Sequence, residues 1–531
     1  MGPMPLTEVK FIRTFLRDEP VDMTVEEVLK HATDLDFRLD HDVSGMEFMS
    51  VVRFLSHIGA RMLQKDDSLK EGDREDPLPN ELIAETLAEL EADQPLYGGE
   101  QNFFQIPDAK VLDGGVRKPV SVLSPTAPGN NSQAYWSRDK YKPVTLPKEE
   151  ALRCMLIFSM YSLVGNGKLE DHRQRNGSPG VRCPKAKNTI TEMFVKSQTL
   201  WSSLLCSIPL TWIEGEGMPA WADPKGEKSK TDMGMHPLWL ASWTPNGIVG
   251  YWEGENLVAV KVGGVPSERL GPFHELMGDP WGQGDILERY KKWIAQRDEE
   301  DPFRLYVRDS KGILRAKRLD LSKDLIQLAV EWANELTVRD LESQFAERVW
   351  VPDFIDDSLL FARHQIAGNN FTLLIRDSVV TGTKKSLWCL NPDEKIQTRI
   401  INQAKFIDTL KKRVCAPFCR QSDKDHPTFD DLADLRPMME TEFWRRITPV
   451  YEEVISTAQA ADFEAVELSK KGVDATIAAL EAVIKPYLLQ NPEAYSVAGG
   501  MGFGWWLVEH YLPYHINRPN SCGLGESTRG R

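Results

Sequence analysis

The residues from Ala367 to Phe371 place a glycine, two asparagines and a phenylalanine in one short run. Gly368 lets the backbone approach a groove closely, and the amides of Asn369 and Asn370 can donate to the acceptors of a DNA minor groove. The apolar ring of Phe371 can enter a base step as a wedge. The run therefore predicts a loop that separates stacked bases, although the same residues would also form an ordinary turn with its ring in the core.

Two further loops carry residues suited to nucleic acid. Amides and aromatic rings gather in a proline- and glycine-rich stretch that contains Asn130, Asn131, Gln133, Tyr135 and Trp136. A later loop opens with glycines and continues into a basic segment, through Gly165, Asn166, Gly167, Lys168, Arg173, Arg175, Gly177, Gly180, Arg182 and Lys185. Its first four residues are typical of a helix C-cap. They also resemble a phosphate loop, but Leu169 stands where a P-loop needs Ser or Thr.

The charge of the chain is acidic overall and basic in patches. A formal net charge of −15 opposes tight binding of bulk duplex by the isolated chain, because such affinity comes from neutralising phosphates. Basic residues nevertheless gather between positions 168 and 187 and again between 289 and 318. Runs of this kind either bind phosphates or form ordinary solvated faces.

No catalytic motif is evident. The sequence contains neither a Gly-x-Ser-x-Gly elbow nor a His-Glu-x-x-His pair, and we expect no cofactor. His41 and Asp42 could belong to a metal-dependent nuclease or phosphohydrolase, which would need further ligands on the same ions. Cys415 and Cys419 are four residues apart with no evident fourth ligand, so structural thiols are favoured over a metal site.

The elements that would position these loops form an α+β fold. Ser44 to Glu47 reads as a capping box that opens an amphipathic core helix, and helices are expected near 81–93 and 149–164. Short strand-like runs follow between Trp239 and Val307: LWLASW, NLVAVKV and FRLYVRD. Beyond residue 391 apolar stripes repeat at helical spacing, which predicts a four-helix bundle whose last helix includes Trp505 to Leu512. We therefore expect a mixed α/β domain over 1–390 and a helical bundle over 391–531.

Composition sets the cellular context. The chain of 531 residues is 41% hydrophobic and 27% charged, has no run of eighteen apolar residues and lacks a signal-peptide core, so a cytoplasmic protein without a membrane partner is expected. Its seven cysteines are an odd number at scattered spacings, which favours reduced thiols.

Taken in order, these features resemble CasA, the large subunit of the type I-E CRISPR surveillance complex Cascade. The resemblance begins with DFRLDHDVSGMEFMSVVRFLSHIG and continues through QNFFQ at 101–105. It extends over the amide-rich loop before Tyr135, the basic loop after Val164, the Ala-Gly-Asn-Asn-Phe loop and the closing bundle. Each match is short, but together they span nearly the whole chain.

The resemblance implies a non-enzymatic subunit that recognises the protospacer-adjacent motif (PAM) of target duplex DNA from the minor groove and starts strand separation. Guide RNA pairing then reads the remaining sequence. Asn370 and Phe371 would be the wedge, and Asn131 to Tyr135 would order on DNA. The glycine loop would be either Gly165 and Gly167 or Gly177 and Gly180. The implied partners are the guide RNA ribonucleoprotein, with its backbone and small subunits, and a helicase-nuclease recruited in trans.

Three departures from that family bear on which motif is read. Phe371 stands where familiar members carry glutamine, so insertion by stacking would replace an amide contact. The zinc-binding cysteine quartet of some members is absent, since no Cys-x-x-Cys pair occurs. A minor-groove lysine finger has no counterpart, and Arg269 is its positional candidate. The alternatives to a DNA-recognition subunit are the metal-dependent nuclease or phosphohydrolase above and a scaffold that makes no DNA contact.

Overall fold

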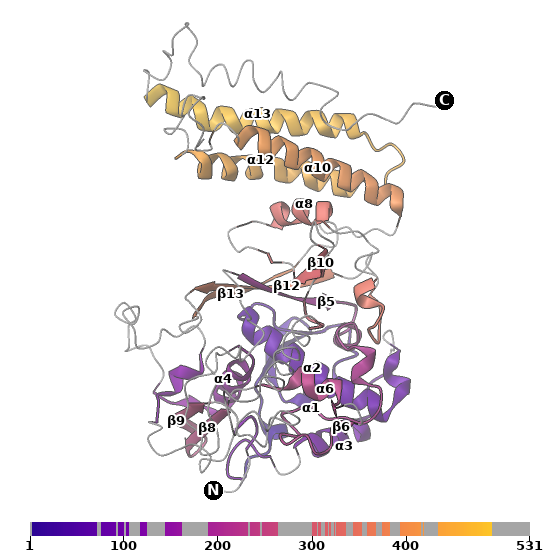
Figure 1. Cartoon of the computed structure of the whole chain (residues 1–531), viewed down its shortest axis with the longest axis vertical. Helices are drawn as coiled ribbons and strands as arrows, with labels where there is room; N and C mark the ends of the chain where they lie inside the picture. Colours follow the sequence, from indigo (N-terminus) through magenta and orange to yellow (C-terminus); the bar gives the residue numbers. More distant parts are fainter. Residues whose placement is uncertain are drawn as a thin grey trace, which may run out of the picture. The chain divides into compact units, whose positions relative to one another are not determined.

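The structure is a computed structural model, and it divides the chain into two compact units (Figure 1). It describes residues 3–71, 76–91, 94–99, 102–105, 117–124, 144–161, 189–231, 234–244, 247–263, 300–304, 306–308, 314–316, 318–319, 323, 325–335, 343–352, 358–367, 374–382, 393–415, 418 and 434–490. Unit 1 comprises Met1–Leu321 and Glu342–Gly382, and unit 2 comprises Ser322–Leu341 and Thr383–Arg531. Unit 1 is mixed α/β and the described part of unit 2 is helical, so the predicted fold class is confirmed.

The helices of unit 1 surround one long central helix. They are α1 (Val25–Lys30), α2 (Gly45–Lys65), α3 (Asn80–Glu91), α4 (Lys148–Tyr161), α5 (Leu200–Leu205) and α6 (Pro237–Ser242). Short 3-10 turns lie at Leu6–Glu8, Asp67–Lys70, Val120–Leu123 and Leu210–Trp212. Because α2 packs on α3, α4, α5, β12 and β13, nearly its whole circumference is buried.

The strands of unit 1 form small sheets. Those with three strands have the orders β2 (Glu19–Met23), β1 (Ile12–Leu16), β3 (Phe37–Leu39); β13 (Leu374–Gly382), β12 (Ser358–Ala367), β5 (Thr189–Lys196); and β4 (Leu146–Pro147), β9 (Asn256–Gly263), β8 (Gly247–Glu253). Two-stranded ribbons join β6 (Lys230–Thr231) to β7 (Gly234–Met235) and β10 (Tyr306–Arg308) to β11 (Leu314–Ala316). All these pairings are antiparallel.

The start of α2 follows the predicted pattern in most respects. The Ser44 hydroxyl accepts from the Glu47 backbone N–H at 3.2 Å, which caps the helix as predicted. The Glu47 carboxylate, which a capping box would return to the Ser44 backbone, instead accepts from Arg13 Nη1 at 3.2 Å. Burial raises the pKa of Glu47, against the charges of Arg13 and Arg153. Beyond the cap, Phe48, Val51, Leu55, Ile58 and Met62 are all buried, as their spacing predicts.

One predicted strand is a helix. The run LWLASW lies in α6, not in a sheet. Pro237 takes the first turn, where its missing N–H costs no hydrogen bond, and the His236 side chain caps the helix by accepting from Leu238 N–H at 3.2 Å. A run of six residues, five of them apolar, fits either structure by periodicity, and the flanking proline decided between them. NLVAVKV is strand β9, as predicted, and in FRLYVRD only Tyr306 to Arg308 form strand β10.

The described helices of unit 2 are α8 (Leu325–Glu335), α10 (Glu394–Cys415), α12 (Arg436–Thr457) and α13 (Ala465–Gln490). The last three pack on one another, and α8 packs on α10 and α12 (Figure 1). The predicted stripes supply much of the seam: Ile400, Ile407, Leu410, Val414, Phe443, Ile447, Val454, Leu480 and Ile484 are buried. The fourth predicted helix, Trp505 to Leu512, lies outside the described residues. Unit 2 includes α8, which precedes the expected boundary at residue 390.

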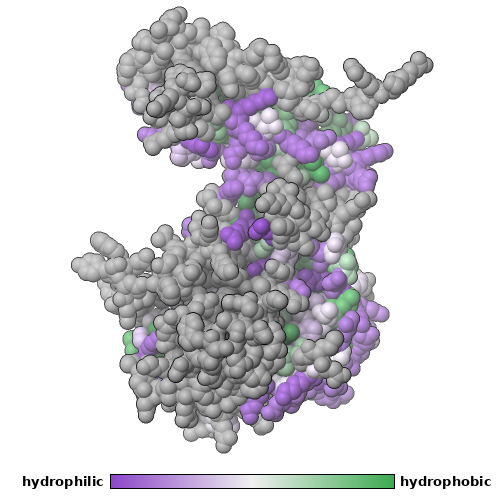
Figure 2. Space-filling view, in the orientation of Figure 1, coloured by the Kyte–Doolittle hydropathy of each residue, from purple (hydrophilic) through white to green (hydrophobic). Residues whose placement is uncertain are grey.

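On the face shown in Figure 2, hydrophilic side chains predominate among the coloured residues. No helix within the described ranges combines the length and the apolar character needed to cross a bilayer.

Candidate nucleic-acid interface

The predicted DNA-binding residues all lie outside the described residues, so their roles stay predictions. They are Asn130, Asn131, Gln133, Tyr135, Gly165, Asn166, Gly167, Lys168, Gly177, Gly180, Arg269, Asn369, Asn370 and Phe371. What the structure describes is the elements to which these segments are attached. Those attachments can be traced residue by residue.

The predicted wedge segment connects two paired strands. Strands β12 and β13 are antiparallel, and their last described pair on this side is Ala367 with Leu374. The register shifts between Gln365 and Ile366, as in a β-bulge, just before the strand ends. Residues 368–373, which include Phe371, therefore join the two strands of a hairpin.

The basic segment attaches to the same end of this sheet. It lies between Tyr161, the last residue of α4, and Thr189, the first residue of β5. Strand β5 pairs antiparallel with β12, and Thr189 lies opposite Gln365. Because the strands run in opposite directions, β5 begins at the end where β12 leads into residues 368–373. Two segments predicted to contact DNA thus leave one end of one sheet.

A third segment ends beside β5. Residues 264–299, which include Arg269, follow β9 and are succeeded by Glu300 and Asp301. The backbone N–H of Met193, on β5, donates to the Phe303 carbonyl at 2.7 Å. That bond fixes the chain leaving the third segment against the sheet that carries the other two.

The amide-rich segment is attached elsewhere. Residues 125–143 lie between Ser124 and Val144, and on the near side Lys118 exchanges two backbone hydrogen bonds with Val260 of β9, at 2.8 and 3.0 Å. On the far side Leu146 pairs with Leu257, also on β9. Helix α4 follows directly and carries the chain to Tyr161.

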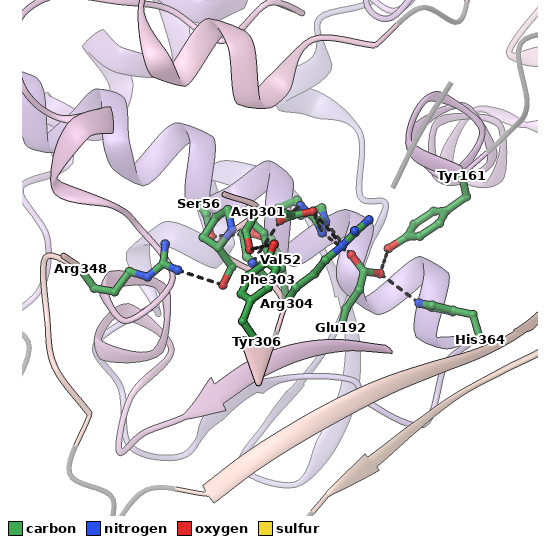
Figure 3. Close-up of polar contacts among 12 residues, drawn as sticks. Val52, Ser56, Tyr161, Glu192, Asp301, Phe303, Arg304, Tyr306, Arg348 and His364 are labelled. Carbon is green, nitrogen blue, oxygen red and sulfur yellow. Dashed lines mark hydrogen bonds and ion pairs between the residues drawn. The ribbon is translucent and has the colours of Figure 1, made fainter. Parts of the chain in front are cut away.

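A buried ionic cluster lies where the first three attachments meet (Figure 3). Arg53 Nη1 and Nη2 each donate to Asp301 at 2.9 Å, and Arg53 Nε donates to Glu192 at 2.9 Å. The guanidinium also lies 4.2 Å from the centre of the Phe303 ring, and Arg304 Nε lies 3.6 Å from Asp301. Such fork-shaped contacts match the planar geometry of arginine. Arg53 is 1% exposed and Glu192 0% exposed, so this is an interior cluster.

The cluster continues across the sheet as a chain of hydrogen bonds. The Tyr161 hydroxyl donates to Glu192 Oε2, and His364 Nε2 lies 3.0 Å from the same oxygen (Figure 3). His364 Nδ1 lies 2.7 Å from the hydroxyl of Ser378, on β13, and that hydroxyl accepts from Met46 N–H at 2.9 Å. An ionised carboxylate only accepts, so Nε2 of His364 carries the proton. Helices α2 and α4 and all three strands of the sheet are thereby joined.

In the cluster the cost of burying each charge is offset by a neighbouring opposite charge. Burial alone would raise the pKa of Glu192, but the charge of Arg53 and the hydrogen bond from His364 lower that pKa to about 2. Burial likewise acts to lower the pKa of Arg53, and the carboxylates of Asp301 and Glu192 raise it instead. Both partners are therefore charged at neutral pH, and each charge is compensated by hydrogen bonds.

The cluster is built to position elements. Glu192 accepts from Nε and Nη2 of Arg53 at Oε1 and from Tyr161 and His364 at Oε2, which fills the roughly four acceptor sites of a carboxylate. No acceptor capacity is left for a substrate or a transferred proton. What the arrangement can do is hold the ends of α4, β5 and β12 in register.

The alternative metal site finds little support in the described residues. His41 Nδ1 lies 3.5 Å from Arg38 Nη1, and a neighbouring guanidinium disfavours a bound cation. The Asp42 backbone N–H donates to Asp40 Oδ1 at 2.9 Å, as in a turn. Within the described part of the chain, no group of three or more His, Cys, Asp or Glu side chains could hold a metal ion.

The sequence interpretation missed the cluster, although it carries a signal. Arg53 interrupts the apolar run of α2, Glu192 stands inside the strand TITEMFVK, and His364 inside LLFARHQIA. Charged or polar residues within apolar runs must find partners when buried. Their partners were not predictable, because Arg53 and Asp301 lie 248 positions apart in the sequence.

Comparison with known proteins gives a consistent result. The family model for the CRISPR-associated protein Cse1 matches residues 6–256. None of the curated proteins compared matches the sequence. Among solved structures, CasA of Thermus thermophilus is 14% identical with a TM-score of 0.60, covering 97% of this chain and 99% of that one.

Two other solved structures are similar to the same extent. Cse1 of Thermobifida fusca is 14% identical with a TM-score of 0.62, covering 97% of each chain. A chain of a structure described as a CRISPR RNA-guided surveillance complex is 15% identical with a TM-score of 0.62, covering 92% of this chain and 96% of that one. At such identities these likenesses establish the fold.

Proposed function

We propose that this chain, whose residues 6–256 match the family model for the CRISPR-associated protein Cse1, belongs to that family and is the DNA-recognition subunit of a CRISPR RNA-guided surveillance complex. In this role it binds the PAM duplex from the minor groove, and Phe371 wedges the strands apart. The subunit has no catalytic activity of its own and recruits a helicase-nuclease that degrades the target.

One observation supports the proposal beyond the family match. The segments that carry the candidate wedge and the basic glycine loop both attach to one end of the sheet formed by β13, β12 and β5. A protein that reads a short duplex motif and opens the adjacent step needs its reading and opening segments side by side. The shared attachment supports such an arrangement.

The energetics of a ring wedge are sufficient to begin opening. Unstacking one base step costs a few kcal/mol, and an aromatic ring stacked on a base returns about 1–3 kcal/mol. The remaining cost falls to guide pairing and to backbone contacts. An acidic subunit fits if basic partner subunits hold most phosphates while this chain supplies its local basic patches.

The test replaces Phe371 with alanine in the assembled complex. The rate of R-loop formation is measured on a PAM-bearing duplex and on the same duplex with the protospacer already melted. We expect slower opening of the closed duplex, about 10-fold for a loss of 1.4 kcal/mol, and little change on the melted one. Phe15→Ala, which removes a half-buried ring from strand β1, is the matched control and should show no such selectivity.

Three outcomes would contradict the proposal. An equal loss on both substrates would show that Phe371 is not a wedge. Cleavage of labelled DNA by the purified chain with Mg²⁺ or Mn²⁺, abolished by His41→Ala, would favour the nuclease alternative. Crosslinking of the assembled complex to target duplex separates a recognition subunit from a scaffold, since a scaffold would give no crosslink in this chain.

A further inference from the structure

One carboxylate holds the ends of two segments that the proposed function assigns to DNA. Glu192 Oε2 accepts from the Tyr161 hydroxyl and from His364 Nε2 at 3.0 Å. Tyr161 is the last residue before the basic segment 162–188, and His364 stands three residues before Ala367, where β12 ends. The path from one segment's attachment to the other therefore passes through two hydrogen bonds.

The carboxylate itself is held rigidly from its other side. Arg53 Nε donates to Glu192 Oε1 at 2.9 Å, and the same guanidinium is locked by two bonds of 2.9 Å to Asp301. Asp301 lies two residues after the end of residues 264–299, the segment that carries Arg269. Arg53 stands in the middle of α2, which is buried around nearly its whole circumference. The position of Glu192 is thus fixed by Arg53, and Tyr161 and His364 are hydrogen-bonded to Glu192.

Burial makes these hydrogen bonds effective restraints on geometry. Glu192 and His364 are 0% exposed, and Tyr161 is 4% exposed. Water does not compete for the bonds at such sites, so each bond restrains the geometry of the groups it joins. A buried ion pair contributes little net stability compared with apolar packing, which leaves geometric specificity as a reason for its presence.

We propose that Tyr161 and His364, joined through Glu192, are positioning residues that fix the basic segment relative to the wedge hairpin, so that reading of the PAM and opening of the adjacent step occur together. This inference rests on the proposed function. Neither residue touches DNA in it. Each acts through the strand or helix end that it holds.

Chemically small substitutions separate this role from a purely structural one. Tyr161→Phe removes one hydroxyl and keeps the ring. His364→Asn retains an amide near the position of Nδ1 and loses the bond to Glu192, whereas His364→Gln can still donate an N–H at the position of Nε2. His364→Gln is therefore the conservative variant expected to restore function.

A matched control comes from the same unit. Tyr97 is a buried tyrosine, 4% exposed, whose ring packs 4.8 Å from that of Trp252, and it is outside the cluster. Tyr97→Phe removes the same atom as Tyr161→Phe. We expect it to leave both DNA readouts unchanged.

The experiment uses the complete complex with its guide RNA. We expect Tyr161→Phe and His364→Asn to slow R-loop formation on a closed PAM-bearing duplex about 10-fold, because small displacements of an aligned group lose large factors in rate. Binding to the duplex with a melted protospacer should stay within about twofold, since no step must then be opened. His364→Gln should lie near the parent chain on both substrates.

The outcomes distinguish the positioning role of Tyr161 and His364 from the proposed function. Equal slowing on both substrates, or no slowing on either, would overturn the positioning role. If Phe371→Ala slows the closed duplex selectively while His364→Asn does not, only the positioning role is wrong. If Phe371→Ala also lacks selectivity, the proposed function fails first. Hydrogen exchange of the α2 amides checks that each variant is folded, and Tyr161→Phe remains informative if His364→Asn is not.

Discussion

Units 1 and 2 each contain a glutamate whose pKa is strongly lowered by arginine, one in the interior and one at the surface. In unit 1 complete burial acts to raise the pKa of Glu192, yet the charge of Arg53 and the hydrogen bond from His364 outweigh it and bring that pKa to about 2. In unit 2 the pKa of Glu442 is also about 2, chiefly through hydrogen bonds from Arg445 and Arg446 on the helix surface. Arg445 lies three residues after Glu442 on α12, and its side chain is 62% exposed.

The difference teaches what each unit uses its charges for. In unit 2 the interface between the described helices is mainly apolar. Ion pairs such as that of Lys412 with Asp408 lie on exposed helix faces. In unit 1 charges are placed inside, where they join strands and helices that are far apart in sequence. An apolar seam tolerates sliding and repacking, whereas a saturated buried cluster specifies one arrangement. Unit 1 is the unit to which the segments proposed to read DNA attach.

The largest effect is expected from Arg53→Met. This change leaves the carboxylates of Glu192 and Asp301 buried without their shared cation, which typically costs about 3–5 kcal/mol. The free energy of unfolding of unit 1 can be followed by hydrogen exchange of the α2 amides in urea.

The matched control in unit 2 is Lys412→Met. Its side chain is 75% exposed and pairs with Asp408 four residues earlier on α10. Surface pairs contribute about 0–1 kcal/mol, so unit 2 should scarcely change. If the two substitutions had similar effects, the contrast drawn between the units would be wrong.

A smaller but definite loss is expected from Gly45→Ala. A Cβ at this position would lie 2.9 Å from Ser378 Oγ, 3.2 Å from Ala362 Cβ and 3.2 Å from the Val379 carbonyl. Because all three neighbours belong to strands β12 and β13, the start of α2 must move away from these strands. We expect a cost of about 1–3 kcal/mol, as for other overpacked sites, measured as the shift in urea midpoint. An unchanged midpoint would mean that α2 and the sheet are not held in close register.

The elements of both units were largely predictable from sequence, because local rules govern them. The Ser44 cap and the apolar spacing of α2 fixed that helix, and the stripes in α10 and α12 fixed two more. The same rules failed at residues 238–243, where five apolar residues and Ser242 showed no clear period and Pro237 set the outcome. The local signal of Pro237 would have corrected that prediction, without any knowledge of tertiary contacts.

The positioning cluster was not predictable, because its meaning lies in distant pairings. Arg53 and Glu192 are each visible as a charge in an apolar run, but 139 positions separate them. Sequence alone could equally have paired Arg53 with any carboxylate brought near by folding. The segments proposed to bind DNA had the reverse character: their composition indicated a function, while the shared attachment of residues 162–188 and 368–373 followed only from the register of β5, β12 and β13.

Gly472→Ala extends the glycine comparison to unit 2 with the opposite sign. Gly472 lies within α13, and a Cβ there would make ordinary contacts of 3.5 Å with Leu410 and Phe406. Glycine inside a helix is less favourable than alanine by about 0.5–1 kcal/mol, so the substitution should stabilise unit 2 by that amount. Thermal unfolding of the variant beside Gly45→Ala gives both signs in one experiment. Destabilisation would show that the seam of unit 2 is as intolerant as the core of unit 1.

The smallest expected change is the response of the two glutamates to salt. Both pKa values lie below the ordinary value of 4.5, so the unfolded chain binds more protons than the folded one between about pH 4.5 and 2. The stability contributed by each group is therefore present above pH 4.5 and is lost as the pH falls toward 2. Salt at 1 M shortens the screening length to about 3 Å, which weakens exposed pairs and leaves buried ones nearly intact.

We therefore expect salt to raise the pKa of Glu442 toward 4.5 and to leave that of Glu192 low. Carbon-13 shifts of labelled glutamate carboxylates report the pKa of Glu442, with Glu442→Gln for assignment. Acid unfolding of unit 1, followed by exchange of the α2 amides, reports Glu192. If salt shifted the pH midpoint of acid unfolding of unit 1 as much as it shifts the pKa of Glu442, the cluster around Arg53 would have to be open to solvent. Its fixed geometry, and with it the proposed alignment of the two DNA-reading segments, would then lose its physical basis.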